Sequence, residues 1–217
     1  MDSPVIGPSG KHDATVIFLH GLGDTGHGWA AGFEAIKEPN IKYIFPTAAP
    51  MPVTLNGGVP MPSWFDIVSL DHNGKEDEKG VKKAAAELLE MVDKESAASG
   101  LPHNKIMIGG FSQGGATALY ALVTAQKQLG GVVALSAWLP LHKQLEKVEI
   151  AHKGVAVLQC HGDCDPMVSF TFGDMSNKML VQKGMTKCTF KPYPGMSHGS
   201  SAKEMNDVKN FIETTLL

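Results

Sequence analysis

The sequence predicts an α/β protein built on a mainly parallel, twisted sheet with helices on both faces. Short apolar runs of strand length alternate along the chain with segments of helical pattern, as parallel sheets require. No internal repeat and no linker interrupts this alternation, and 217 residues suffice for one well-buried α/β unit. We therefore expect a single domain over residues 1–217, with a loosely ordered N-terminal segment at residues 1–13.

The first half of the chain is expected to begin with a buried strand that leads into a glycine-rich turn and a short helix. A second strand follows, and later a long helix that ends at Gly100 and Pro102, which are helix-stop signals. In chain order, these elements cover residues 15–20 (strand), 29–36 (helix), 41–45 (strand) and 78–98 (helix).

The second half of the chain continues the alternation. Leu119, Leu122 and Val123 recur at helical spacing in an alanine-rich stretch, and the last strand alternates between apolar and polar residues. The expected strands cover residues 105–111, 131–137, 155–161 and 186–193, and the expected helices cover 116–125, 170–182 and 203–216. Ligands of such sheets bind at the carboxyl ends of the strands, so the loops that follow them are the candidate site.

Composition excludes several classes of function. The formal net charge is -3 and all 19 basic residues are lysines, so a nucleic-acid surface is not expected. The three cysteines, an odd and low count, fit a reducing compartment rather than a disulfide framework. No signal-peptide core and no bilayer-spanning apolar stretch is present. We expect a soluble, cytoplasmic protein.

The pentapeptide Gly110-Phe111-Ser112-Gln113-Gly114 in the middle of the chain matches the pattern G-x-S-x-G. This pattern is typical of a serine on a sharp turn between a strand and a helix, with glycines where the backbone approaches closely. An apolar run of strand length precedes it and a helical pattern follows it. An idle serine in a glycine-rich turn is the alternative, but this context favours a nucleophile and hence a serine hydrolase.

A serine nucleophile requires a histidine as base and an acid that orients this histidine. In hydrolases with this turn, the acid and then the histidine follow the serine along the chain. Of the four histidines after Ser112, only His198 also lies downstream of the aspartates that follow the strand at 155–161. Asp165 is the favoured acid because Pro166 biases it towards an extended backbone. The predicted catalytic residues are Ser112, Asp165 and His198.

Two alternatives remain for the segment around Asp165. Asp163 competes for the role of the acid, although it could instead brace the turn by accepting hydrogen bonds from backbone amides. The segment is also dense in possible metal ligands, yet the paired spacings of a zinc site are absent. We predict no metal and no cofactor. The possible ligands are Cys160, His161, Asp163, Cys164 and Asp165.

The loop after the first strand begins at His20 with the residues HGLGD. Hydrolases with a serine turn use one backbone N–H from this loop, and one from the residue after the nucleophile, to bind the oxyanion. Leu22 and Gln113 are therefore the predicted donors. A glycine-rich turn braced by His20 is the structural alternative, and it is compatible with this role because both need a rigid loop.

Five motifs in order, from about Thr15 to the C-terminus, resemble the acyl-protein thioesterase branch of the small carboxylesterases, within the phospholipase/carboxylesterase branch of the α/β-hydrolases. The resemblance implies an α/β-hydrolase fold with the triad at Ser112, Asp165 and His198, and the oxyanion donors at Leu22 and Gln113. The motifs are HGLGDTGHGW (20–29), MPSWFD (61–66), GFSQGG (110–115), SAWLP (136–140) and HGDCDP (161–166).

The resemblance also implies the activity, namely removal of long acyl groups such as palmitoyl from S-acylated protein cysteines. A general carboxylesterase or lysophospholipase acting on small esters or single-chain lipids is the alternative, and a non-catalytic hydrolase-like binding module is a more distant one. Some eukaryotic members carry an acylated cysteine near the N-terminus, which residues 1–10 lack. Transient contact with a membrane surface is therefore expected instead of a constitutive anchor.

Residues 46–70 are apolar but contain five prolines, so they cannot form a regular helix. Their apolar side chains could pack on the edge of the sheet, or they could cover a groove for an alkyl chain or touch a membrane. Trp64 is expected in the core, whereas Leu55 is a candidate to line the groove. Trp138 and Met167 lie beside the predicted site loops and are further candidates for substrate binding.

Overall fold

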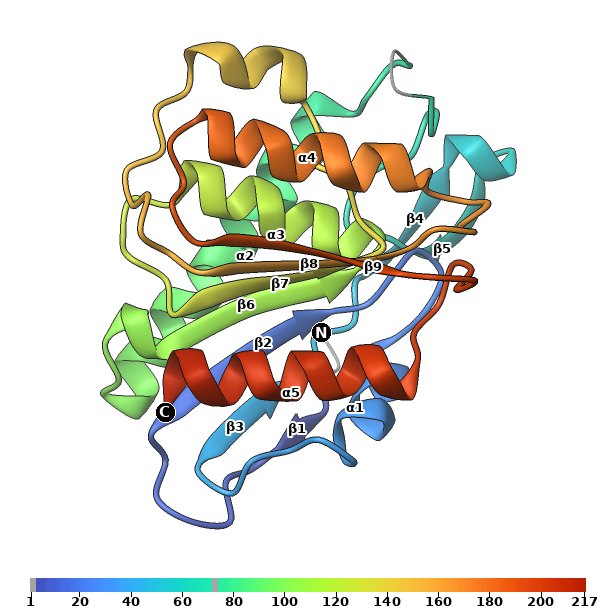
Figure 1. Cartoon of the computed structure of the whole chain (residues 1–217). Helices are drawn as coiled ribbons and strands as arrows, with labels where there is room; N and C mark the ends of the chain where they lie inside the picture. Colours follow the sequence, from blue (N-terminus) through green and yellow to red (C-terminus); the bar gives the residue numbers. More distant parts are fainter. Residues whose placement is uncertain (1–2, 72–73) are drawn as a thin grey trace.

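The centre of the molecule is a mainly parallel sheet with helices on both faces, as the sequence predicts (Figure 1). The structure is a computed structural model that describes residues 3–71 and 74–217. The sheet has the strand order β1-β3-β2-β6-β7-β8-β9, and only the pair β1–β3 is antiparallel. Its strands are β1 (Val5–Ile6), β2 (Ala14–Leu19), β3 (Ile41–Ile44), β6 (Ile106–Phe111), β7 (Gly131–Leu135), β8 (Val157–Gly162) and β9 (Cys188–Tyr193).

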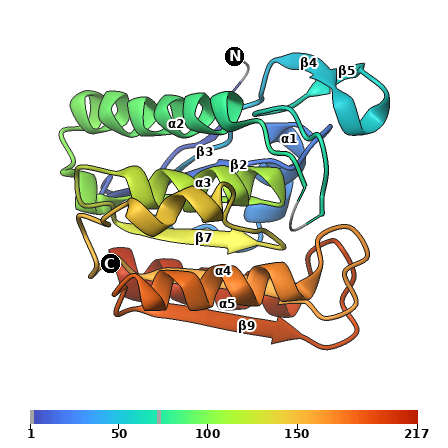
Figure 2. The same ribbon diagram turned by 90° about the horizontal axis from the view of Figure 1, so that it is seen from above.

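The helices form two layers that enclose the sheet (Figures 1 and 2). One layer holds α2 (Glu78–Ser99), α3 (Gln113–Thr124) and α4 (Phe170–Gln182), and the other holds α1 (Gly26–Phe33) and α5 (Ala202–Leu216). Every residue of β2 and of β7 is buried. Because both faces of these strands are covered, their sequences are continuously apolar and do not alternate.

Several boundaries differ from those expected from the sequence. The segment at residues 1–13 is not loosely ordered throughout, because β1 pairs with Tyr43 and Ile44 at the edge of the sheet. Helix α3 begins at Gln113, directly after the serine, and not at residue 116. Strand β7 ends at Leu135, because the next residue, Ser136, has a positive φ of 47°. Only two residues form β1, which is too short to produce a periodic pattern.

The proline-rich segment forms a hairpin of β4 (Pro50–Val53) and β5 (Val59–Pro62), which is separate from the main sheet. A short 3-10 helix, Thr54–Asn56, closes its tip and carries Leu55, which is 43% exposed. In Figure 2 the hairpin extends away from the body of the molecule. Two further 3-10 helices cover His103–Lys105 and His142–Lys147. The residue after β5, Ser63, returns to the protein interior.

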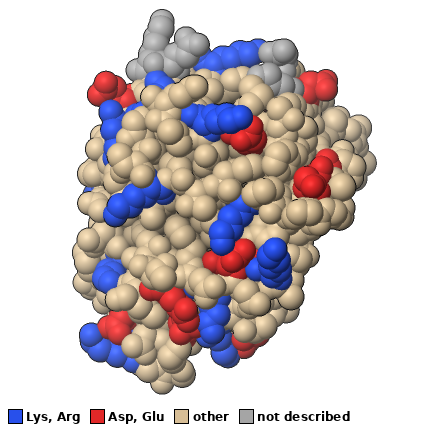
Figure 3. All heavy atoms as spheres, in the orientation of Figure 1, with Lys and Arg blue, Asp and Glu red and all other residues tan. Residues whose placement is uncertain are grey.

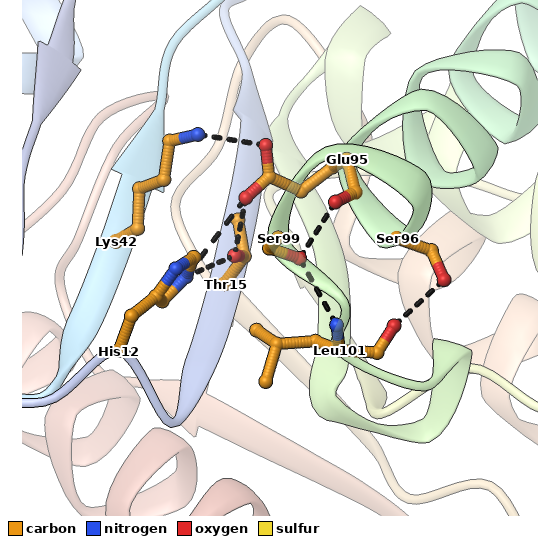
Figure 4. A network of polar contacts seen from close by, with 7 residues as sticks. All are labelled: His12, Thr15, Lys42, Glu95, Ser96, Ser99 and Leu101. Carbon is orange, nitrogen blue, oxygen red and sulfur yellow. Dashed lines mark hydrogen bonds and ion pairs between the residues drawn. The ribbon is translucent and has the colours of Figure 1, made fainter.

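A buried carboxylate ties α2 to the sheet at the end opposite to the serine turn (Figure 4). Glu95 of α2 accepts a hydrogen bond from Thr15 Oγ1 of β2 at 2.9 Å and lies 2.7 Å from Lys42 Nζ of β3. The side chain of Glu95 is only 6% exposed, so these partners stabilise a charge that burial would otherwise penalise. The contacts fix the amino-terminal ends of two neighbouring parallel strands to the helix that covers them.

Charged side chains of both signs are interspersed on the face of the molecule drawn in Figure 3, which is largely uncharged. Among the helices of residues 3–71 and 74–217, none combines the length and apolar character needed to span a bilayer.

Candidate active site

Ser112 lies on the sharp turn between β6 and α3, at the carboxyl end of the central strands. Its backbone angles, φ 51° and ψ -116°, are strained for a residue with a side chain. The flanking glycines permit this turn. A Cβ at Gly110 would lie 2.3 Å from the carbonyl carbon of Gly114, and a Cβ at Gly114 would lie 2.4 Å from the oxygen of Leu19. The pattern G-x-S-x-G therefore reflects close backbone packing around the serine.

His198 links Ser112 to Asp165 through both of its ring nitrogens. Its Nε2 atom lies 3.1 Å from Ser112 Oγ, and its Nδ1 atom lies 2.7 Å from Asp165 Oδ2. In the tautomer that satisfies both contacts, Nδ1–H donates to the carboxylate and Nε2 accepts from the serine hydroxyl. The structure thus brings together the three residues that the sequence analysis favoured, with the side chain of Asp165 buried and that of His198 partly open to solvent.

Asp165 is held in one orientation by its other oxygen. The backbone N–H groups of Met167 and Val168 donate to Oδ1 at 2.8 and 2.9 Å. Burial by itself would raise the pKa of Asp165, but hydrogen bonds from His161, from His198 and from these two backbone groups outweigh it. They hold the pKa of this carboxyl well below its usual range. The carboxylate is therefore ionised and fixed opposite the histidine.

His161 also contacts the acid, although the sequence analysis named it only as a possible metal ligand. It lies at the end of β8, fully buried, with Nε2 3.4 Å from Asp165 Oδ2 and 2.9 Å from the carbonyl oxygen of Val168. The spacing of four residues to Asp165 could have indicated a contact, but only if the turn between them were already known.

Asp163 does not contact His198. Its carboxylate accepts a hydrogen bond from the backbone N–H of Gly195 at 2.7 Å. This bond braces the loop that carries His198, as the alternative interpretation of Asp163 proposed. The two aspartates therefore face different partners, although only one residue separates them.

Of the possible metal ligands of this segment, His161 and Asp165 have side chains that contact each other. Cys160 belongs to the core on the side of α5, with its Sγ atom 3.5 Å from the hydroxyl of Tyr193, whereas Cys164 is exposed. Among the residues that the structure describes, no group of three or more histidine, cysteine, aspartate or glutamate side chains is arranged to hold a metal ion.

The two predicted oxyanion donors leave neighbouring strands. Leu22 follows β2 and Gln113 follows β6 as the first residue of α3. The loop after β2 passes beside the nucleophile, since a Cβ at Gly21 would lie 3.5 Å from Ser112 Cβ. Within the described part of the chain, no protein acceptor takes the backbone N–H of Leu22 or of Gln113. Both groups are available to a ligand, and the partial positive charge of a helix N-terminus adds to the attraction at Gln113.

His20 braces this loop. One ring nitrogen, Nδ1, lies 2.6 Å from the carbonyl oxygen of Gly21, and the other, Nε2, accepts from the backbone N–H of Ala48 at 3.0 Å. Burial lowers the pKa of His20, and the hydrogen bond to Gly21 and the charge of Asp24 offset only part of this effect. A neutral His20 with its proton on Nδ1 satisfies both contacts, which supports a structural role for this residue.

An apolar pocket of about 250 Å³ adjoins the triad without including Ser112 or His198. One of its lining residues, Val168, donates its N–H to Asp165, and another, Trp138, lies in the loop after β7. Trp138 is thus the one of three predicted substrate-binding residues that lines this pocket. Its lining comprises Ser69, Leu70, Asp71, Glu76, Trp138, Leu139, His142, Val168, Phe172, Met175, Ser176, Lys178, Met179 and Gln182.

Leu55 and Met167 do not line this pocket. Leu55 lies at the tip of the hairpin and Met167 points outwards from the loop of Asp165, with 43% and 54% of their surfaces exposed. Their apolar character indicated a groove, but the projection of the hairpin and the turn at Asp165 direct both side chains to the surface.

A serine on a strand–turn–helix, facing a histidine and a buried aspartate at the carboxyl edge of a mainly parallel sheet, defines an α/β-hydrolase. The family model described as phospholipase/carboxylesterase matches residues 1–216. The chain belongs to this family of hydrolytic enzymes.

Relatives that are named as acyl-protein thioesterases are similar to this chain over almost their full lengths. Acyl-protein thioesterase 1 of Cryptococcus neoformans is 42% identical, with 97% of this chain and 96% of the relative covered. The protein of the same name from Schizosaccharomyces pombe is 39% identical, with 100% and 97% covered. Among solved structures, acyl-protein thioesterase 2 of Zea mays superimposes with a TM-score of 0.90 at 33% identity, covering 100% of this chain and 99% of the other.

Proposed function

We propose that this protein hydrolyses acyl thioesters and esters through an acyl-enzyme on Ser112, and that its principal substrates are long-chain acyl groups, such as palmitoyl, on protein cysteines. The observation that carries the proposal is the continuous hydrogen-bond chain from Ser112 through His198 to Asp165 beside an apolar pocket. The acyl-protein thioesterases among the relatives support the choice of substrate.

In the first half-reaction, Ser112 Oγ attacks the acyl carbon while His198 Nε2 takes its proton. Asp165 keeps the imidazole in the required tautomer and stabilises the imidazolium that forms. The tetrahedral intermediate then collapses, the thiol or alcohol leaves with a proton from His198, and the acyl group remains on Ser112. The 3.1 Å contact between Ser112 and His198 supports direct proton transfer.

In the second half-reaction, water attacks the acyl carbon and His198 again removes a proton. The carboxylic acid leaves and Ser112 regains its hydrogen. In both halves the oxyanion accepts hydrogen bonds from the N–H groups of Leu22 and Gln113, which bind the developing charge more strongly than the neutral carbonyl. No cofactor enters either half of this reaction.

The pocket lined by Trp138, Phe172, Met175 and Met179 binds the acyl chain in this proposal. Each buried methylene contributes about 0.8 kcal/mol. Chain lengths that differ by one methylene therefore differ in binding by only roughly fourfold. We expect a broad optimum over acyl length, and a sharp preference for acetyl esters would exclude an acyl pocket.

We place the reaction in the cytoplasm, at membrane surfaces that hold S-acylated proteins. The low cysteine count supports a reducing compartment. The exposed side chains of Leu55 and Val59 on the hairpin supply an apolar surface for transient contact with lipid.

The test is a comparison of purified wild-type protein on an S-palmitoyl peptide, a lysophospholipid and a series of nitrophenyl esters, with Ser112→Ala as the matched control. We expect the palmitoyl thioester to have the highest kcat/KM, and Ser112→Ala to lose both turnover and labelling by a fluorophosphonate. Faster turnover of the lysophospholipid or of small esters would favour a lysophospholipase or a general carboxylesterase. Turnover or labelling retained by Ser112→Ala would contradict the assignment of the nucleophile.

A further inference from the structure

The strand ladder does not determine how far apart the two oxyanion donors lie. The last paired residues of β2 and β6 are Leu19 and Gly110, so Leu22 and Gln113 each lie three residues beyond the end of the ladder. Beyond that point the two loops touch near Gly114 and Gly21, but the backbone ladder between the two strands has ended. If both N–H groups are to bind one oxygen atom, contacts other than ladder hydrogen bonds must fix their separation.

Trp64, from the segment after β5, contacts both loops. Its backbone N–H donates to Gln113 Oε1 at 3.1 Å, and its indole Nε1–H donates to the carbonyl oxygen of His20 at 2.9 Å. Its ring also packs against the ring of His20, with centroids 5.1 Å apart. One residue therefore connects the loop after β2 to the loop after β6 by two hydrogen bonds.

The neighbours of Trp64 strengthen both attachments. The amide of Gln113, which is fully buried, donates from Nε2 to Ser63 Oγ at 2.8 Å and to the carbonyl oxygen of Phe65 at 2.7 Å. The carbonyl oxygen of Pro62 accepts from the N–H of Gly23, which directly follows Leu22, at 2.8 Å. Residues 62–65 thus form a strap, and the oxyanion strap is the name used for them below.

We propose that Trp64 is a positioning residue that sets the separation of the Leu22 and Gln113 N–H groups, and that the oxyanion strap preorganises the oxyanion hole. This inference rests on the proposed function, because it assigns a purpose to donors that the mechanism uses. Stabilisation of the oxyanion depends on donors that are in place before the charge develops. A displacement of about 1 Å can cost roughly a hundredfold in rate.

The indole N–H is the group to remove. Trp64→Phe keeps an aromatic ring against His20 and keeps the backbone bond to Gln113, but it leaves the His20 carbonyl oxygen without this donor. Benzothienyl-alanine at position 64 replaces only the N–H by sulfur and preserves the bicyclic shape. This variant keeps the test valid if Trp64→Phe does not fold. Tyr43→Phe is the matched control, since it removes one partly buried hydrogen bond, from the N–H of Glu38 at 2.9 Å, on the other face of the sheet.

The measurements are kcat and KM for a thioester, the affinity for an alkyl trifluoromethyl ketone, and the melting temperature, with active sites counted by fluorophosphonate. For both position-64 variants we expect kcat to fall about tenfold and the affinity for the ketone, which forms a tetrahedral oxyanion, to fall in parallel. KM should stay near the wild-type value, because the ground-state carbonyl uses the donors less. Tyr43→Phe should keep the wild-type kcat.

Three results would overturn the proposal. The first is that both position-64 variants keep the wild-type kcat per labelled site, even if fewer sites are labelled. That result would show that Trp64 supports only the folded structure. The second is a raised KM with unchanged kcat, which indicates substrate binding. The third is wild-type protein without Ser112-dependent turnover. This last result is visible before any strap variant is made, so it identifies failure of the proposed function itself.

Discussion

His198 Nδ1 lies 2.7 Å from Asp165 Oδ2, and this contact is rigid on the aspartate side. Two backbone N–H groups hold the second oxygen of Asp165, so the carboxylate cannot rotate away from the ring. The ring of Phe111 packs against the histidine with centroids 4.7 Å apart. The orientation of the imidazole is therefore determined before any substrate arrives, which is the condition for efficient proton transfer.

The first prediction concerns the acid. Asp165→Asn should lower kcat by about 10⁴-fold, because an amide favours the wrong tautomer of the histidine. Asp163→Asn should retain most of the activity, since Asp163 only braces the loop through the N–H of Gly195. Steady-state kinetics on one thioester measure both variants. An inactive Asp163→Asn beside an active Asp165→Asn would reverse the assignment.

The second prediction concerns the turn around the nucleophile. Gly114→Ala should abolish fluorophosphonate labelling, because the added Cβ would lie 2.4 Å from the oxygen of Leu19 and 2.6 Å from that of His20. Backbone atoms cannot yield as a flexible side chain can, so the turn must open. Gly32→Ala is the matched control, since no atom beyond its chain neighbours and the backbone of its own helix lies within 4 Å of its Cβ position. Labelling of Gly114→Ala at the wild-type rate would contradict this account.

The third prediction is a dependence of stability on pH. Burial raises the pKa of Glu204, in the first turn of α5, from 4.5 to about 8, and the charge of Asp207 adds to this shift, while the backbone of Ser201 offsets part of it. Between these two values the folded protein binds more protons than the unfolded chain. The free energy of unfolding should therefore fall as pH rises through this window, by at most about 1.4 kcal/mol per pH unit.

Glu204→Gln tests this dependence, because glutamine is neutral at every pH and can retain the capping arrangement with Ser201. Urea denaturation between pH 5 and pH 9 gives the free energy of unfolding for both proteins. We expect the variant to show a flatter profile and to exceed the wild type in stability at the alkaline end. Parallel profiles would show that Glu204 does not titrate in this range.

The fourth prediction concerns the buried carboxylate at the opposite end of the sheet. Glu95→Gln should lower the free energy of unfolding by about 1–3 kcal/mol, because Lys42 loses its charged partner and the bond from Thr15 weakens. Glu90→Gln, on the exposed side of α2 beside Lys94, should leave stability unchanged. When activity is expressed per titrated active site, Glu95→Gln and Glu90→Gln should have the same kcat. If Glu95→Gln and the wild type had equal free energies of unfolding in urea, Glu95 would not have the structural role assigned to it.

The fifth prediction distinguishes between the pocket and the hairpin as the binding site of the acyl chain. Met175→Trp should reduce turnover of long-chain esters and leave short-chain esters nearly unaffected, because the larger ring fills the pocket. Leu55→Ala should leave the chain-length profile in solution unchanged, since Leu55 lies at the tip of the hairpin. The measurement is kcat/KM across a series of nitrophenyl esters. A shifted optimum in Leu55→Ala alone would place the acyl chain along the hairpin.

Local sequence patterns were sufficient to predict most helices and strands of the fold. The strand before Ser112 and the helix after it are both buried, so their apolar runs mark them, and the expected α4 segment at 170–182 matches Phe170–Gln182. The strand β1 and the hairpin β4–β5 were not predicted, since two residues are too few for a period and prolines obscure a strand pattern. Chain order selected Ser112 and His198 because this class of turn fixes the order of its partners, whereas the preference for Asp165 over Asp163 depended on Pro166.

The sequence by itself determined the mainly parallel α/β architecture, the serine turn and the order of its partners, because each depends on residues close together in the chain. Only the tertiary structure decided which aspartate faces His198, that His161 reaches the same carboxylate, and that Trp64 joins the loops of His20 and Gln113. It also decided that Trp138 lines the apolar pocket while Leu55 and Met167 lie outside it. These relationships join residues far apart in the chain, and their geometry depends on the packing of the whole sheet.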